Sequence, residues 1–452
     1  MAAAFQSILF DPGDARAALK GLPEKSAVFA LYGEVANAEP YIGRTPNLRG
    51  RLERLLLPSP KHPKRLQLAG RVRRIEWRLT GSDFESLLLQ FNLLEEIYGA
   101  QCLERMHLSA PSFVRFLGGN PYPRVVVTNR PSQREADWAY GPFASRAAAE
   151  RFADETLKLF LLRRCTDELD PDPSHPGCVY SEMKMCLAPC YQGCTDERYA
   201  EESTAVERFL ATRGDSRLVQ LRTQRDEASA NLEFESAASI HAQVERAEAV
   251  RALAPELVRP LSQLRAVVLQ AAPEPDQVAV FLYEQGRLRG PAAFSTLGMR
   301  IQNEQSGSSS LFAQPMALEP VPEEQGAGNR EEGTVRDDGA EGRRDEDGPE
   351  AEEPAASGTG KAEAKAAARA SRGMLQARLE GVLAALANQP GPPNAVVRQG
   401  HLALLKRWYY RPEVKRPGEI SFPDEEGAWP VKAILRGIGR IAAKSLTAPT
   451  VP

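Results

Sequence analysis

The segment Pro40–Leu52, Pro-Tyr-Ile-Gly-Arg-Thr-Pro-Asn-Leu-Arg-Gly-Arg-Leu, constrains the fold of this chain more than any other stretch. The pattern predicts a strand that ends in Tyr41, a turn at Gly43 and a helix whose exposed face carries arginines. Glycine lets the backbone approach a neighbour closely. Nine residues separate Tyr41 from Arg51, enough for a tight turn and about two helical turns. A phenol and a guanidinium are therefore expected to meet at a strand–turn–helix junction.

Such a pair suits a phosphodiester. The phenol can relay a proton, and the planar fork of the guanidinium matches phosphate oxygens. An ordinary amphipathic helix after a strand is the alternative that this segment alone leaves open.

A second segment offers a carboxylate. Residues Arg74–Leu79 alternate polar and apolar side chains, which predicts a half-buried strand. After Thr80-Gly81-Ser82-Asp83 the period becomes helical, and Ser82 or Asp83 can cap the first turn. Glu85 lies near this helix start, where a glutamate is also a favourable partner of the helix dipole. The apolar positions expected to face a core are Phe84, Leu87, Leu88, Phe91, Leu93 and Leu94.

Together these segments resemble the GIY-YIG nuclease family. Ala27–Phe29 stands at the first motif, Tyr41–Gly43 at the second and Glu85–Leu94 at the third. The resemblance implies a three-stranded antiparallel sheet with flanking helices over residues 1–100. It also implies one Mg²⁺ or Mn²⁺ ion held by Glu85 for phosphodiester hydrolysis. Tyr41 would orient or deprotonate the attacking water, and the remaining roles fall to Arg51 (charge neutralisation), Arg44 (polarisation) and Asn92 (support of the site).

One position departs from the family pattern. Phe29 replaces the tyrosine of the first motif and has no hydroxyl to give. Tyr32 is the nearest candidate to substitute, but alternation along a strand points it to the opposite face from Phe29. Two interpretations follow, an active nuclease or a catalytically impaired one.

Further along, the resemblance narrows to the UvrC family. Tyr140–Ser145 predicts a turn before a helix with apolar positions at Ala149, Phe152, Ala153, Leu157 and Phe160. Four cysteines follow in the UvrC layout: Cys165, Cys178, Cys186 and Cys190, with Cys194 soon after. Grouped thiolates bind zinc or iron–sulfur clusters. The resemblance favours an iron–sulfur cluster over zinc. A disulfide scaffold, which nothing secretory in the sequence supports, and a redox sensor are the alternatives.

Residues 215–253 predict a helical hairpin that turns near Asn231. Leu232–Ala238 is close to the UVR motif of the family, and Phe234, Ala237 and Ala238 are expected to allow a tight approach of two helices. The resemblance implies that Leu232, Phe234, Ala237 and Ala238 contact UvrB. A hairpin that packs only on its own domain is the alternative.

Charge and hydropathy set further limits. The net charge is only −3, but nine lysines and arginines against two glutamates lie between Arg44 and Arg78, a cluster that can follow a DNA backbone. The amino terminus does not resemble a signal peptide, and no apolar run reaches membrane-spanning length. We therefore expect a cytoplasmic protein with reduced cysteines and no membrane contact.

The whole chain is expected to be an α+β protein. The regions after residue 100 are a cysteine-rich α/β region (101–200), the hairpin (215–253), a small β region (262–303), a disordered acidic linker (304–372) and a helical remnant of the family's C-terminal region (373–452). No carboxylate group of the RNase H-like kind follows Glu419, so the resemblance implies only the 3′ incision at damaged double-stranded DNA held by UvrB. The alternative is an accessory protein that binds DNA and UvrB.

Overall fold

The computed structural model describes residues 4–35, 38–57, 68–297, 358–389 and 394–447. It divides into two compact units, Met1–Thr296 with Gln376–Pro452, and Leu297–Leu375. All contacts described below lie within the first unit. The mixture of helices and sheets confirms the expected α+β class. Residues 304–357 of the expected acidic linker lie outside the described residues.

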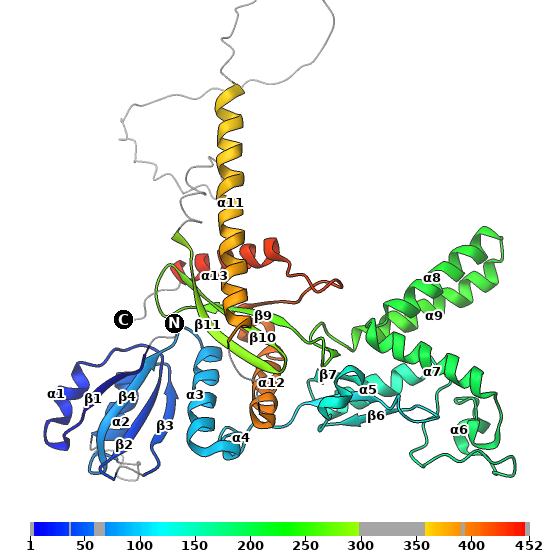
Figure 1. The fold of residues 1–452 in the computed structure, drawn as a ribbon, viewed down its shortest axis with the longest axis horizontal. Helices are drawn as coiled ribbons and strands as arrows, with labels where there is room; N and C mark the ends of the chain where they lie inside the picture. The colour runs from blue at the N-terminus through cyan, green and yellow to red at the C-terminus, as the bar shows by residue number, and fades with distance from the viewer. Residues whose placement is uncertain (1–3, 36–37, 58–67, 298–357, 390–393, 448–452) are drawn as a thin grey trace, which may run out of the picture. The chain divides into compact units, whose positions relative to one another are not determined.

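The amino-terminal sheet has four antiparallel strands rather than the expected three (Figure 1). Its order is β1-β4-β2-β3, with β1 Gln6–Leu9, β2 Ala27–Gly33, β3 Tyr41–Thr45 and β4 Val72–Leu79. The additional strand β1 pairs with the far edge of β4. It escaped prediction because four mostly exposed residues carry too little alternation to identify a strand. The strand expected at Arg74–Leu79 is confirmed.

The two faces of this sheet pack against different helices. Phe29, Trp77 and Leu31 lie in a core with α1 (Ala15–Lys20) and α2 (Leu48–Leu56). Ile42 packs against the core that includes α3 (Asp83–Tyr98). Since neighbouring residues of a strand point to opposite faces, each strand residue can be assigned to the α2 face or the α3 face.

Gly43 lies inside β3, which corrects the expected turn. It is paired with Phe29 of β2, and a Cβ at Gly43 would lie 2.7 Å from the Phe29 Cζ atom. Glycine is required here by the neighbouring ring rather than by a change of chain direction. The helix α2 begins only at Leu48, where the Asn47 side chain accepts a hydrogen bond from the Gly50 N–H at 2.8 Å.

A second four-stranded sheet occupies the middle of the chain, in the order β6-β5-β7-β8. The expected turn at Tyr140–Ser145 is wrong, because strand β7 continues to Phe143 and only Ser145 breaks it by capping α5. The helix expected after it is confirmed. The elements are β5 Ser112–Phe116, β6 Val125–Thr128, β7 Ala139–Phe143, β8 Arg259–Pro260, α4 Cys102–Arg105, α5 Arg146–Leu157, α6 Val179–Glu182 and α7 Asp196–Ala211.

The expected hairpin forms from α8 (Asp215–Ala230) and α9 (Phe234–Ala252), drawn in green in Figure 1. Its inner contacts differ from the prediction. The buried residues are Leu218, Leu221, Val244 and Ala247, whereas Phe234 is 65% exposed and Leu232 72% exposed. Ala238 is also exposed, so the tip residues do not bring the two helices together.

A third sheet has the order β11-β10-β9-β12, with β9 Ala266–Ala271, β10 Gln277–Glu284, β11 Arg287–Ser295 and β12 Glu419–Ser421. The strands predicted in residues 262–303 are confirmed, and β12 joins them from the C-terminal region. The helices of that region are α11 Gly358–Ala387, α12 Ala395–Tyr409 and α13 Val431–Thr447. The helix α11 begins at Gly358, inside the expected disordered linker (304–372), because its first residues are mostly Ala, Lys and Glu, which favour helix.

One core joins elements from distant parts of the sequence. It contains Phe84 and Phe91 of α3, Phe281 of β10 and Trp408 of α12. The contact is close, since a Cβ on Gly400 would lie 2.2 Å from the Phe91 ring. None of the described helices is both long and apolar enough to cross a lipid bilayer.

Candidate active site

Tyr41 and Arg51 meet as the spacing predicts. The Arg51 Nη2 atom donates a hydrogen bond to the Tyr41 hydroxyl at 3.3 Å. Tyr41 begins β3 and points to the α2 face, where its ring centroid lies 6.2 Å from that of Phe29. Both residues keep part of their surface open to solvent. A phosphate oxygen can therefore approach a hydroxyl and a guanidinium at one place.

Phe29 is fully buried beneath this pair. Tyr32, the candidate substitute for the missing hydroxyl, pairs with Arg74, while Phe29 pairs with Trp77. The register puts Tyr32 on the α3 face, as alternation predicts. Its ring lies under the Arg74 guanidinium at 4.3 Å, and burial together with the neighbouring Glu76 raises the pKa of the phenol. Tyr32 does not replace the first-motif tyrosine.

Glu85 lies on the other face of the sheet from Tyr41 and Arg51. Ser82 caps α3 by accepting a hydrogen bond from the Glu85 N–H at 3.1 Å. The Glu85 carboxylate accepts one from the Gly81 N–H at 2.9 Å and lies near Arg78. The register pairs Arg78 with Val28, on the face opposite Phe29. Glu85 is only 3% exposed, and burial raises its pKa although Gly81 and Arg78 oppose the shift.

The surroundings of Glu85 do not fit a resident magnesium ion. Glu85 opens on a cavity of about 240 Å³ lined also by Arg78, Glu274 and Gln277. A protein usually binds Mg²⁺ through carboxylates and substrate phosphates, but here a guanidinium lies beside the one buried carboxylate. Within the described ranges, no group of three His, Cys, Asp or Glu side chains is arranged to hold a metal ion. No reaction step is therefore assigned to a Glu85-bound cation.

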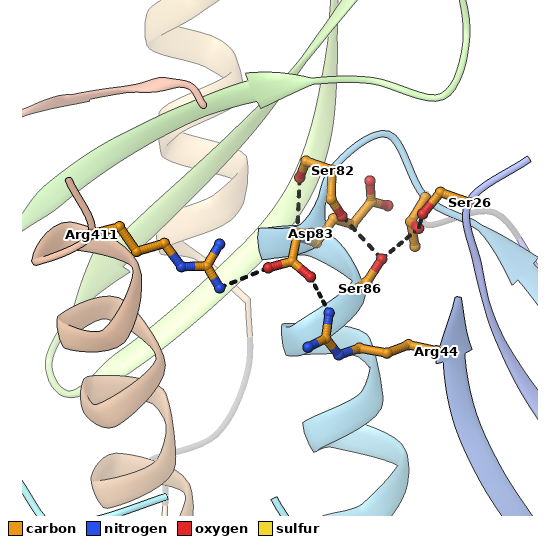
Figure 2. A network of polar contacts seen from close by, with 8 residues as sticks. Ser26, Arg44, Ser82, Asp83, Ser86 and Arg411 are labelled. Carbon is orange, nitrogen blue, oxygen red and sulfur yellow. Dashed lines mark hydrogen bonds and ion pairs between the residues drawn. The ribbon is translucent and has the colours of Figure 1, made fainter. Parts of the chain in front are cut away.

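Arg44 belongs to an ion-pair network on the α3 face (Figure 2). The Asp83 carboxylate accepts from Arg44 with one oxygen and from Arg411, beyond the end of α12, with the other at 2.7 Å. Sequence reasoning missed Asp83 and Arg411. Asp83 carried a first-turn signal, which indicated only a helix start, and no local pattern relates Arg411 to a residue more than three hundred positions earlier.

Asn92 lies further along the same helix, is exposed, and contacts α12. Its Oδ1 atom is 3.2 Å from the Nε2 atom of His401. The Nδ1 atom of His401 accepts a hydrogen bond from the Leu288 N–H at 2.9 Å, so Nε2 carries the proton and donates it to Asn92. In this structure Asn92 joins α3 to α12, away from the Tyr41–Arg51 pair.

The basic cluster between Arg44 and Arg78 is partly neutralised. Arg49 pairs with Glu24 at 2.5 Å, Arg73 with Glu34 at 3.3 Å and Arg74 with Glu76 at 3.2 Å. Lys61, Lys64 and Arg65 lie outside the described residues.

The cysteine-rich segment keeps its thiols free. Burial raises the pKa of Cys186 to about 11, and Cys165, Cys178 and Cys190 lie near enough to raise it further. The Ala188 N–H donates to the Cys186 sulfur at 3.3 Å. The donor type suits an iron–sulfur cluster, but these thiols are not arranged as a closed ligand set. Cys102 is buried elsewhere, in the shared core.

Comparison with known proteins supports the relationship suggested by the motifs. Residues 113–209 match the family model described as the UvrC/Cho excinuclease middle domain. The chain is 32% identical to the UvrABC system protein C of Alcanivorax borkumensis over 212 residues, 47% of this chain and 34% of that protein. It is 29% identical to the protein of the same name from Shigella dysenteriae over 238 residues, 52% of this chain and 40% of that protein.

The match to these curated relatives therefore spans between a third and two fifths of their length. No solved structure matches the fold. The matched middle domain includes the cysteine-rich segment and follows α3 and α4 along the chain. Over about half of its length, this chain is similar to proteins of the UvrC family.

Proposed function

We propose that this protein works in nucleotide-excision repair of DNA as a UvrC-type subunit, and that it contacts the phosphodiester backbone through Tyr41 and Arg51. The observation that carries the proposal is the 3.3 Å hydrogen bond between the Arg51 guanidinium and the Tyr41 hydroxyl. An arginine so held can offer its remaining N–H groups to a phosphate. The tyrosine hydroxyl, an acceptor from Arg51, keeps its proton free to donate to a second phosphate oxygen.

Two activities fit such a contact. The first is metal-dependent endonuclease action at the 3′ side of a lesion in double-stranded DNA held by UvrB. In it Arg51 would neutralise charge on the phosphoryl oxygens, and Tyr41 would orient the attacking water. This activity needs a cation, Mg²⁺ or Mn²⁺, at the same phosphate to stabilise the leaving oxygen.

The second activity is binding without cutting, as an accessory protein for DNA and UvrB. Two observations favour it. Phe29 supplies no hydroxyl beneath the pair, and the Glu85 carboxylate lies on the α3 face beside Arg78. The Tyr41–Arg51 pair on the α2 face has no carboxylate of Glu85 beside it, which supports the accessory role better than incision.

A nicking assay decides between the two activities. The substrate is a lesion-bearing duplex with UvrA, UvrB and Mg²⁺, and the proteins are the wild type, Arg51→Ala and Glu85→Gln. The accessory role predicts no nicks from any of the three and about tenfold weaker DNA binding by Arg51→Ala, the loss of one charge-assisted contact.

Nicks from the wild type that disappear in Arg51→Ala would instead establish incision. The Glu85→Gln variant then tests whether Glu85 binds the catalytic cation. Nicking by this variant should persist if Glu85 is remote from the phosphate. Equal DNA binding by the wild type and Arg51→Ala would refute the proposed contact altogether.

We further propose that Cys165, Cys178, Cys186 and Cys190 hold an iron–sulfur cluster once their thiols are deprotonated by iron. The proximity of the other three thiols to Cys186 supports this. Protein purified without oxygen should show visible absorption and bound iron, both lost in Cys186→Ser. Bound zinc with no visible absorption would contradict it. Cys102→Ser is the matched control, because Cys102 lies outside the group.

A further inference from the structure

The helix α13 (Val431–Thr447) carries buried isoleucines on one side and exposed cations on another. Ile434, Ile438 and Ile441 are buried, the first two with no exposed surface. Lys432, Arg436, Arg440 and Lys444 recur every fourth residue and are all exposed. The rise of an α-helix spaces these cations about 6 Å apart along one side. The helix contains no acidic residue, so it presents an exposed basic stripe.

A hollow lies at the start of this stripe. It has a volume of about 460 Å³ and is lined by Gln376, Glu380, Trp429, Lys432 and Arg436, among others. The volume lies in the range of pockets that accept small organic groups. The Arg265 guanidinium lies 4.9 Å from the Trp429 ring centroid and holds the indole in place at the wall. The hollow thus joins an aromatic ring to the first two cations of the stripe.

The polar wall of the hollow carries an acceptor. The Gln376 amide donates to a Glu380 carboxylate oxygen at 2.9 Å, which orients that carboxylate on α11. A carboxylate accepts hydrogen bonds from the exocyclic amino groups of nucleobases, as in glutamate contacts to cytosine N4. Thymine has no such amino group.

The partner of this surface follows from its two components. A row of cations with an aromatic ring beside it is the pattern by which proteins bind single-stranded nucleic acid, because bases stack and phosphates pair. A lipid surface does not fit, since a membrane-bound amphipathic helix must insert its apolar face. In α13 that face is already buried against the protein, where a Cβ on Gly437 would lie 3.0 Å from Leu269.

We propose that α13 and the Trp429 hollow form a second nucleic-acid site, which binds a single strand with one base against Trp429 and its phosphates on Lys432 and Arg436. Arg440 extends the path, oriented by two hydrogen bonds to Glu419 at 2.6 and 2.7 Å. The site is separate from Tyr41 and Arg51 and does not require cleavage of DNA.

Fluorescence anisotropy of the full-length chain with labelled dC12, dT12 and inorganic polyphosphate tests the proposal. Trp429→Ala should weaken binding of dC12 about tenfold through the loss of one stacked base and leave polyphosphate binding unchanged. Lys432→Gln/Arg436→Gln should weaken binding of all three probes and reduce the salt dependence by about two phosphate contacts. The wild type should prefer dC12 to dT12, and Glu380→Gln should reduce that preference.

Matched controls separate this site from others. Arg151→Gln/Arg246→Gln removes two exposed cations from α5 and α9 and should leave oligonucleotide binding unchanged. The duplex-binding and nicking assays with Arg51→Ala report on the proposed repair function separately, so its failure stays distinguishable from a failure of this proposal. Trp429→Phe keeps an aromatic ring and should retain most of the affinity. It controls for the possibility that the alanine variant loses affinity because it misfolds.

Three results would overturn the proposal. One is unchanged dC12 affinity in Trp429→Ala. The second is equal loss of affinity in the Arg151→Gln/Arg246→Gln control. The third is tighter binding of polyphosphate or an acidic peptide than of dC12, which would make α13 a general anion surface.

Discussion

At position 43 the side chain is a single hydrogen because the Phe29 ring lies where a Cβ would project. The distance of 2.7 Å to Phe29 Cζ is shorter than a van der Waals contact. Phe29 is fully buried, and close packing of protein cores leaves such a ring little room to move. Gly43 and Phe29 therefore act as one packing unit beneath the Tyr41 ring.

Gly43→Ala should lower the free energy of unfolding by about 1–3 kcal/mol, the usual cost of overpacking a core. Phe29→Leu in the same chain should recover part of the loss, because the shorter side chain vacates the position of Cζ. Urea unfolding measures both. Gly70→Ala is the control, since a Cβ at Gly70 meets no atom within 4 Å and its stability should not fall. Equal effects at the two glycines would contradict the packing argument.

At the same scale, the sequence predicted the contact between Tyr41 and Arg51 but not the position of Glu85 relative to them. The two residues meet as predicted, but by a different path, because Tyr41 begins β3 and Arg51 lies near the start of α2. The position of Glu85 depended on which face of the sheet α3 covers. Local periodicity does not contain that information, so Glu85 was grouped with Tyr41 although the register separates them.

Among the elements, the α8–α9 hairpin has a buried core between its helices and exposed apolar side chains at its turn. Leu218, Leu221, Val244 and Ala247 are buried between the helices. Leu232 and Phe234 lie at the turn with most of their surface exposed. Large apolar side chains exposed together commonly mark a binding surface. The UVR resemblance assigned these residues to a partner, and their exposure leaves them available to one.

Phe234→Ala should leave the stability of the protein unchanged and weaken UvrB binding about tenfold or more, as expected for a buried aromatic anchor at an interface. Isothermal titration calorimetry measures the affinity, and thermal unfolding the stability. Val244→Ala is the complementary control, because it should reduce stability through the hairpin core. Unaltered UvrB affinity in Phe234→Ala would exclude the tip as the contact.

Across the whole molecule, His401 connects segments that are far apart in sequence. It is 2% exposed and hydrogen-bonds both the Leu288 N–H and Asn92. Burial, with a smaller contribution from Arg287, lowers the pKa of His401 to about 3. As the pH is lowered, His401 is therefore protonated in the unfolded chain near the ordinary histidine pKa of about 6.5, and in the folded chain only at a much lower pH.

Stability should consequently fall as the pH decreases from about 6.5 towards 3, because protonation favours the unfolded state over that window. At pH 5 the loss attributable to His401 should be about 2 kcal/mol. Urea unfolding of the wild type and His401→Gln at pH 7 and pH 5 measures it. The variant should have a lower free energy of unfolding at pH 7, and this free energy should fall less between pH 7 and pH 5 than that of the wild type. Parallel losses in both proteins would contradict the assignment.

The contribution of α12 and β12 was the part of the fold that sequence analysis could not supply. Their own patterns predicted a helix and little else, since pairing of β12 with β9 joins residues about 150 positions apart. Non-local pairing of this kind leaves no period in the sequence. The segments of β9 and β10, by contrast, carry short apolar runs that are rich in valine, and this combination favours buried strands.

The joint core of α3, β10 and α12 has a practical corollary for dissecting the protein. A fragment that ends near residue 100 would expose part of this core. Phe84 and Phe91 would lose their contacts with the core that contains Phe281 and Trp408. Such a fragment should aggregate, because its exposed apolar surface would associate with other copies. Point substitutions in the intact polypeptide are the sounder route to assigning each activity.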